Sequence, residues 1–171
     1  PEKKPERLWS KAAAESIVAA CRSKQGSVKE ESKPATQMAP ALFDLTSLQR
    51  EANSKFGFSA KNTLGLAQAL YEKHKVLTYP RTDSRHLPED YMPSVKEALS
   101  KISEINNFQQ FAAKILNNNW VKPNKRIFDN TKISDHFAII PTGHIPKNLS
   151  EPEQKLYDLV TRRFMAVFFP A

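Results

Sequence analysis

The densest polar chemistry of the chain lies between residues 77 and 86. Tyr79 is followed by Pro80 and then by Arg81, so a phenol and a guanidinium stand close together. A phenol can attack a phosphodiester, and a guanidinium can donate two hydrogen bonds to phosphate oxygens while it stays protonated. Helical patterns on both sides place this segment on a connection, where functional side chains are commonly displayed. We therefore interpret Tyr79 as a candidate nucleophile and Arg81 as the group that holds the phosphate.

The reactivity of Tyr79 would depend on its neighbours. A free phenol has a pKa of about 10, so it needs a base or nearby cations to react at neutral pH. Pro80 restricts the residue before it to extended conformations, which would preorganise the direction of the Tyr79 ring. Taken alone, the motif is also compatible with an exposed loop tyrosine that has no chemical role.

Three segments, taken in order, resemble type IA DNA topoisomerases. Residues 70–72 (LYE) and 78–84 (TYPRTDS) are similar to the motif around the active-site tyrosine of that family. Residues 40–53 (PALFDLTSLQREAN) resemble the segment before this motif, and residues 135–142 (DHFAIIPT) resemble the block after it. The FDLT and IIPT variants are similar to the topoisomerase III branch. The resemblance covers roughly residues 10–170.

The resemblance implies a transient cut in one DNA strand. Tyr79 would attack the DNA and become joined to a 5′ phosphate, and Arg81 would contact that phosphate. Because the phosphotyrosine bond conserves the energy of the phosphodiester, strand passage and religation would need no ATP. His136 would contact the scissile phosphate or assist proton transfer, although Phe137 stands where the family often has a second polar residue. Thr142 would bind a backbone phosphate.

The polar residues after Arg81 are ambiguous. As candidate DNA-binding residues we take Thr82, Asp83, Ser84 and Arg85. Side chains of this kind also orient a neighbouring arginine or cap the following turn, and the residues alone do not separate these roles.

The resemblance further implies a magnesium site elsewhere. Family members hold Mg²⁺ with a glutamate and an Asp-x-Asp cluster on a TOPRIM domain. This sequence has no such cluster, and Glu30 with Glu31 does not form one. We therefore expect no metal in this chain, Mg²⁺ on a domain absent from it, and no DNA relaxation by the chain alone. Its start at Pro1 and its apolar end also suggest a piece of a longer protein.

Composition favours a nucleic-acid partner. The formal net charge is +8, which is typical of proteins that bind polyanions. By resemblance the partner would be single-stranded or underwound DNA. No apolar run approaches the ~20 residues that cross a bilayer, so we expect no membrane contact. No signal-peptide pattern opens the chain, so we expect a cytoplasmic, bacterial-type and nucleoid-associated location. We also expect a monomer. The single cysteine, Cys21, is expected to be a buried apolar residue.

The pattern of helix signals predicts an α+β, mainly α chain. By resemblance, residues 46–149 form a gate domain that carries the tyrosine, while residues 1–45 and 150–171 are parts of a β-containing arch domain. Residues 27–40 read as an edge strand or a linker, and Phe108 and Phe111 as core residues. The expected helices are 10–24, 46–56 and 60–75 (the last two a helix-turn-helix-like pair), 88–102, 107–116, and one from residue 150 onward.

Two other functions remain open at this stage. A basic helical module could bind DNA without covalent chemistry. A tyrosine recombinase-like enzyme also uses Tyr, Arg and His, but its tyrosine typically follows the histidine, whereas Tyr79 precedes His136. His74, His86 and His144 have no metal-ligand spacing and are expected to be surface or structural residues. Without its TOPRIM contact, Tyr79 is not expected to be held in a productive pose.

Overall fold

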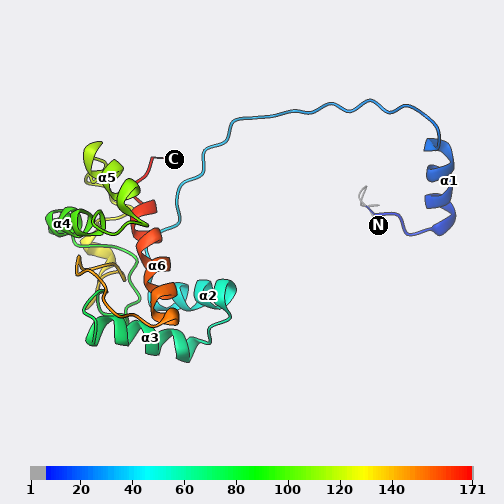
Figure 1. The fold of residues 1–171 in the computed structure, drawn as a ribbon. Helices are drawn as coiled ribbons and strands as arrows, with labels where there is room; N and C mark the ends of the chain where they lie inside the picture. Colours follow the sequence, from blue (N-terminus) through cyan, green and yellow to red (C-terminus); the bar gives the residue numbers. More distant parts are fainter. Residues whose placement is uncertain (1–6, 171) are drawn as a thin grey trace. The chain divides into compact units, whose positions relative to one another are not determined.

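The computed structural model describes residues 7–170, and the chain divides into two compact units between Ala35 and Thr36 (Figure 1). The first unit holds helix α1 (Lys11–Cys21), whose N-cap Ser10 accepts a hydrogen bond from the Ala13 amide at 3.4 Å. Residues 24–42 form neither helix nor strand, so a linker forms here rather than an edge strand.

Cys21 is exposed, and the prediction that it is buried is wrong. Its neighbours Ile17 and Val18 are exposed too, and no residue of α1 is buried. An apolar helix face becomes core only where another element packs on it, and the described part of this unit contains no such element. Helix α1 does have an apolar face, but the periodicity of its residues does not show whether another element packs against that face.

The second unit, from Thr36 onward, is mainly helical, as predicted, and no helix of the described residues is long and apolar enough to span a membrane. Its elements are α2 (Leu45–Phe56), α3 (Ala60–Glu72), the 3₁₀ turn η1 (Glu89–Tyr91), α4 (Met92–Ile102), α5 (Gln109–Asn117), the 3₁₀ turn η2 (Asn130–Lys132) and α6 (Glu151–Ala166). In place of full strands, the described residues contain isolated β-bridges. The domain boundaries at residues 45 and 149 stay predictions.

Local capping explains where these helices begin and end. Asp44 is the N-cap of α2, because its carboxylate accepts from the Ser47 amide at 2.6 Å while the Ser47 side chain accepts from the Asp44 amide in return. Gly57 ends this helix with a φ of +70°, a conformation that costs glycine little. Ser59 caps α3, and Ser150 caps α6 in a capping box.

Helix α6 packs against α2, α3 and α5 and brings the core together (Figure 1). Leu156, Val160 and Phe164 on this helix are fully buried. Of the two phenylalanines expected in the core, Phe108 is 1% exposed, but Phe111 is 39% exposed, so that part of the prediction is wrong.

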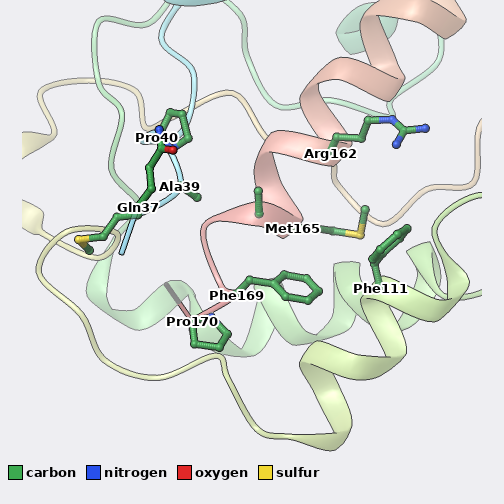
Figure 2. A pocket seen from close by; sticks show the side chains of 10 residues that line it. Gln37, Ala39, Pro40, Phe111, Arg162, Met165, Phe169 and Pro170 are labelled. Atoms are coloured by element: carbon green, nitrogen blue, oxygen red, sulfur yellow. The ribbon is translucent and has the colours of Figure 1, made fainter. Parts of the chain in front are cut away.

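Phe111 is exposed because it lines a cavity instead of filling the core. This cavity has a volume of about 480 Å³ and lies beside the C-terminal end of α6. Figure 2 shows the Met165 side chain reaching toward the Phe111 ring, with Phe169 next to them. Residues 37–40, near the start of the second unit, also line the cavity, together with Arg162, Ala166 and Pro170.

We predict that Leu156→Ala destabilises the second unit by about 2–5 kcal/mol, since the side chain is fully buried and its loss leaves a cavity. Urea denaturation followed by circular dichroism would measure the change. Leu8→Ala is the matched control, because Leu8 is 60% exposed, and it should change the free energy of unfolding by less than about 0.5 kcal/mol. Equal effects of the two substitutions would contradict the assignment of α6 to the core.

Candidate active site

The three sequence segments meet through backbone hydrogen bonds. The Ile139 amide donates to the Phe43 carbonyl at 2.9 Å, which joins the first segment to the third. The Leu45 amide donates to the Thr82 carbonyl at 3.0 Å, which joins the first segment to the second. The Thr78 amide donates to the Ile140 carbonyl at 2.9 Å, which joins the second to the third.

Two threonine hydroxyls fasten the segment of Tyr79 to the segment of His136. The buried Thr78 hydroxyl donates to the Ala138 carbonyl at 3.0 Å and accepts from the Ile140 amide at 2.9 Å. On the other side of Tyr79, the Thr82 hydroxyl donates to the His136 carbonyl at 2.9 Å. Tyr79 is therefore held at a defined place between two buried attachment points.

The ring of Tyr79 lies between two other rings. Its centroid is 4.3 Å from that of His136, with the ring planes inclined by 45°. The Tyr71 ring meets it edge-on at 5.4 Å, and the Lys75 ammonium lies 5.7 Å from the Tyr71 centroid. Aromatic contacts of this kind restrict the orientation of the ring without engaging its hydroxyl.

Three polar groups remain free at this junction. Within residues 7–170, no hydrogen bond or ion pair engages the Tyr79 hydroxyl, the Arg81 guanidinium or the His136 imidazole. Arg81 and His136 are exposed, and Tyr79 is half-buried. Within the described residues the Tyr79 hydroxyl is thus not bonded to Arg81 or His136, and whether its pose is productive stays a prediction.

Other candidate residues use their polar groups within the protein. Thr82 and Ser84 are buried, and the Ser84 hydroxyl donates to the Lys132 carbonyl at 2.8 Å. The Asp83 carboxylate accepts from the Ser134 hydroxyl at 3.4 Å. The Thr142 hydroxyl donates to the Lys75 carbonyl at 2.6 Å. A DNA contact by these residues stays a prediction, and Asp83 and Thr142 are the exposed members.

Arg85, the residue directly after the second segment, pairs electrostatically with the first segment. Its Nε donates to the Asp44 carboxylate at 2.8 Å. Burial raises the pKa of Asp44, but hydrogen bonds from Ser47 and Arg85 outweigh it, so the pKa lies below the ordinary value of 3.8. One carboxylate thereby caps α2 and anchors the arginine that follows the candidate nucleophile.

The sequence by itself indicated no role for Tyr71 or Lys75. Tyr71 lies on α3, and the turn that brings it back over Tyr79 depends on Lys75, whose φ is +58°. Left-handed backbone at a lysine has no signature in a single sequence. The only available signal was the position of Tyr71 within the LYE segment.

Comparison with known proteins agrees with this geometry. All of residues 1–171 match the family model described as DNA topoisomerase. The chain belongs to the DNA topoisomerase family. It is 46% identical over 168 residues to DNA topoisomerase 3 of Bacillus cereus, covering 96% of this chain and 23% of that protein. With DNA topoisomerase 3 of Bacillus subtilis it shares 48% identity over 151 residues, covering 86% and 20% respectively.

A solved structure supports the same family. Full-length topoisomerase I from Thermotoga maritima matches with a TM-score of 0.57 and 25% identity, over 98% of this chain and 26% of that chain. The predicted resemblance to type IA, topoisomerase III-like proteins is confirmed. The topoisomerase chain spans between 20% and 23% of the two Bacillus relatives.

We predict that Asp44→Ala destabilises the topoisomerase chain by about 1–2 kcal/mol at pH 7, because α2 loses its N-cap. The folded pKa of Asp44 is depressed, so its stabilisation is present above pH 3.8 and is lost as the pH falls through the folded pKa. Urea denaturation at pH 7 and at pH 3 would measure the difference between the variant and the wild type, which should shrink at the lower pH.

Asp90→Ala is the control for this substitution, since Asp90 is exposed and caps no α-helix. Its effect should stay within about 0.5 kcal/mol at pH 7. An Asp44→Ala effect that is the same size at both pH values would contradict the role of the ionised carboxylate.

Proposed function

We propose that the topoisomerase chain carries the nucleophile half of a type IA active site, and that a longer protein containing it cuts and reseals single DNA strands. The observation that carries the proposal is the junction of three segments at Tyr79. There the neighbouring threonine hydroxyls hold the nucleophile candidate beside His136, and the polar groups of Tyr79, Arg81 and His136 have no hydrogen-bond partner within residues 7–170.

The proposed step is a transesterification. The Tyr79 oxygen forms a bond to phosphorus, the bond from phosphorus to the 3′ oxygen breaks, and the DNA is left with a 5′ phosphotyrosine and a 3′ hydroxyl. The phenol proton leaves during attack, and the departing 3′ oxygen takes up a proton. His136 is placed against the Tyr79 ring to exchange such a proton or to bind the phosphate. The reverse attack by the 3′ hydroxyl reseals the strand without an external energy source.

Arg81 is proposed to bind the phosphate under attack. It is two residues from Tyr79, exposed, and engaged in no ion pair within the described residues. A guanidinium donates two parallel hydrogen bonds to phosphate oxygens and stabilises the charge that develops on them. Arg85 differs from it, because Asp44 already occupies its Nε.

Mg²⁺ does not fit the residues that the structure describes. Among the described residues, no group of three or more His, Cys, Asp or Glu side chains could hold a metal ion. We propose that Mg²⁺ belongs to another domain of the longer protein, and we derive no step of this chain through it. The full protein is proposed to be a cytoplasmic monomer that acts on single-stranded or underwound DNA, gripped mainly through its backbone.

We predict that Tyr79→Phe abolishes covalent attachment to DNA in the full-length protein that contains this chain. The measurement incubates the protein with Mg²⁺ and end-labelled single-stranded DNA, quenches it with detergent, and detects protein-linked DNA. Tyr91→Phe is the matched control, because Tyr91 is also half-buried and packs on an aromatic ring, Phe137. That control should form the adduct at the wild-type level.

The label also separates the competing functions. Attachment of the protein to the 5′ phosphate supports the topoisomerase proposal, whereas attachment to a 3′ phosphate would indicate recombinase-like chemistry. The absence of any adduct in the wild type, with DNA binding intact, would favour a non-catalytic module.

We predict that Arg81→Lys lowers the rate of strand cleavage by about 10²-fold, since the ammonium cannot reproduce the two-bond contact. Single-turnover cleavage of a labelled oligonucleotide would measure the rate. Lys61→Arg, an exposed exchange on α3, should leave this rate unchanged. A wild-type rate for Arg81→Lys would show that only positive charge is needed at this position.

A further inference from the structure

A second basic site lies beyond the residues considered so far. A pocket of about 580 Å³ is lined by three lysines, two histidines, a glycine and an isoleucine, and its lining includes no carboxylate. Its residues are Lys73, His74, Lys101, Gly143, His144, Ile145 and Lys147. We call it the lysine pocket.

The lysine pocket is formed by the C-terminal end of α3, by α4 and by the loop after residue 142, which pack closely against one another. A Cβ placed on Gly143 would lie 3.2 Å from the Ala98 Cα, so the loop after residue 142 rests directly on α4. Gly143 has a φ of +86°, which favours glycine at this point. The Thr142 amide donates to the Val76 carbonyl at 3.1 Å and fastens the same loop beyond the end of α3.

Two of the pocket cations have no partner in the described part of the chain. Lys101 pairs with Glu104 at 3.0 Å, and His74 contacts Glu153 at 3.2 Å. Neither Lys73 nor Lys147 makes an ion pair with a described residue, and both are exposed. Two uncompensated ammonium groups around a concave pocket favour an anion over an apolar ligand.

The lysine pocket is close to Tyr79 but separate from it. The segments 76–78 and 140–142 pair side by side, as the bridge between Leu77 and Pro141 and the Thr78 amide bond show. Tyr79 follows one end of this pairing, and the pocket begins at the other end. At about 3.3 Å per residue, the paired segment separates the two sites by about 10 Å.

We propose that the lysine pocket binds a backbone phosphate of the same DNA strand that Tyr79 attacks, a few nucleotides from the cut. This proposal rests on the proposed function for the identity of the polyanion. Ammonium groups read charge and not base identity, so the contact contributes to affinity independently of sequence. The contact steadies the strand at a second point while Tyr79 reacts.

The test measures how DNA affinity depends on salt. The topoisomerase chain binds a fluorescently labelled single-stranded oligonucleotide, and anisotropy gives Kd over a series of KCl concentrations. The variant is Lys73→Ala with Lys147→Ala, and the matched control is Lys96→Ala with Lys122→Ala, two exposed lysines outside the pocket. Both pairs remove the same charge, and unchanged melting temperatures would verify that they fold.

We expect the pocket variant to lower the slope of log affinity against log salt by about 0.7 for each phosphate that the protein no longer neutralises. Affinity should fall equally for oligonucleotides of different sequence, while the control pair keeps the wild-type slope. The same slope for both pairs, or a weakening confined to one sequence, would overturn the proposal.

A second arm separates a DNA phosphate from a free one. Inorganic phosphate is titrated into the chain at constant ionic strength while the histidine resonances are followed by NMR. Saturation of His144 by phosphate with no change of the DNA salt slope in the pocket variant would assign the pocket to a small anion and overturn the DNA contact. The Tyr79→Phe adduct experiment is independent, so its failure would remove the proposed chemistry without altering the salt slope.

Discussion

The hydroxyl of Thr78 is the interaction on which the site depends. It donates to the Ala138 carbonyl and accepts from the Ile140 amide, and both partners are buried. A buried hydroxyl with both functions satisfied is costly to disturb, since breaking either bond would leave a polar group without a partner. Together with the Thr82 hydroxyl, it fixes the place of Tyr79 relative to His136, which lies far along the sequence.

Around Thr78, neighbouring polar side chains both stabilise the fold and position the candidate site. Asp44 caps α2 and binds Arg85, while Thr82 holds the backbone of His136. Adjacent polar residues of this motif therefore have different roles. Thr82, Ser84 and Arg85 bond to other groups of the protein, whereas the Arg81 guanidinium has no such partner in the described part of the chain. A dense polar motif therefore holds fewer ligand-binding groups than its composition suggests.

The short pairing of residues 76–78 with 140–142 also links the Tyr79 site to the lysine pocket. Because the two lie at opposite ends of one paired segment, the backbone sets their separation without a flexible connection. The helical core around α6 supports this arrangement from behind, with α3 packed directly on it. A DNA strand that contacts both sites would therefore bind two points whose separation is already set before the DNA arrives.

Local signals in the sequence determined the helices, the caps at Ser59 and Ser150, the turn at Gly57 and the order of the three segments, because each depends on neighbouring residues. The resemblance of the three segments also predicted the family, which the comparisons confirm. Only the tertiary structure decided burial at Cys21 and Phe111, the contact of Tyr71 with Tyr79, and the gathering of lysines around one pocket. These features depend on which distant elements pack together, and that information is absent from the spacing of residues along one chain.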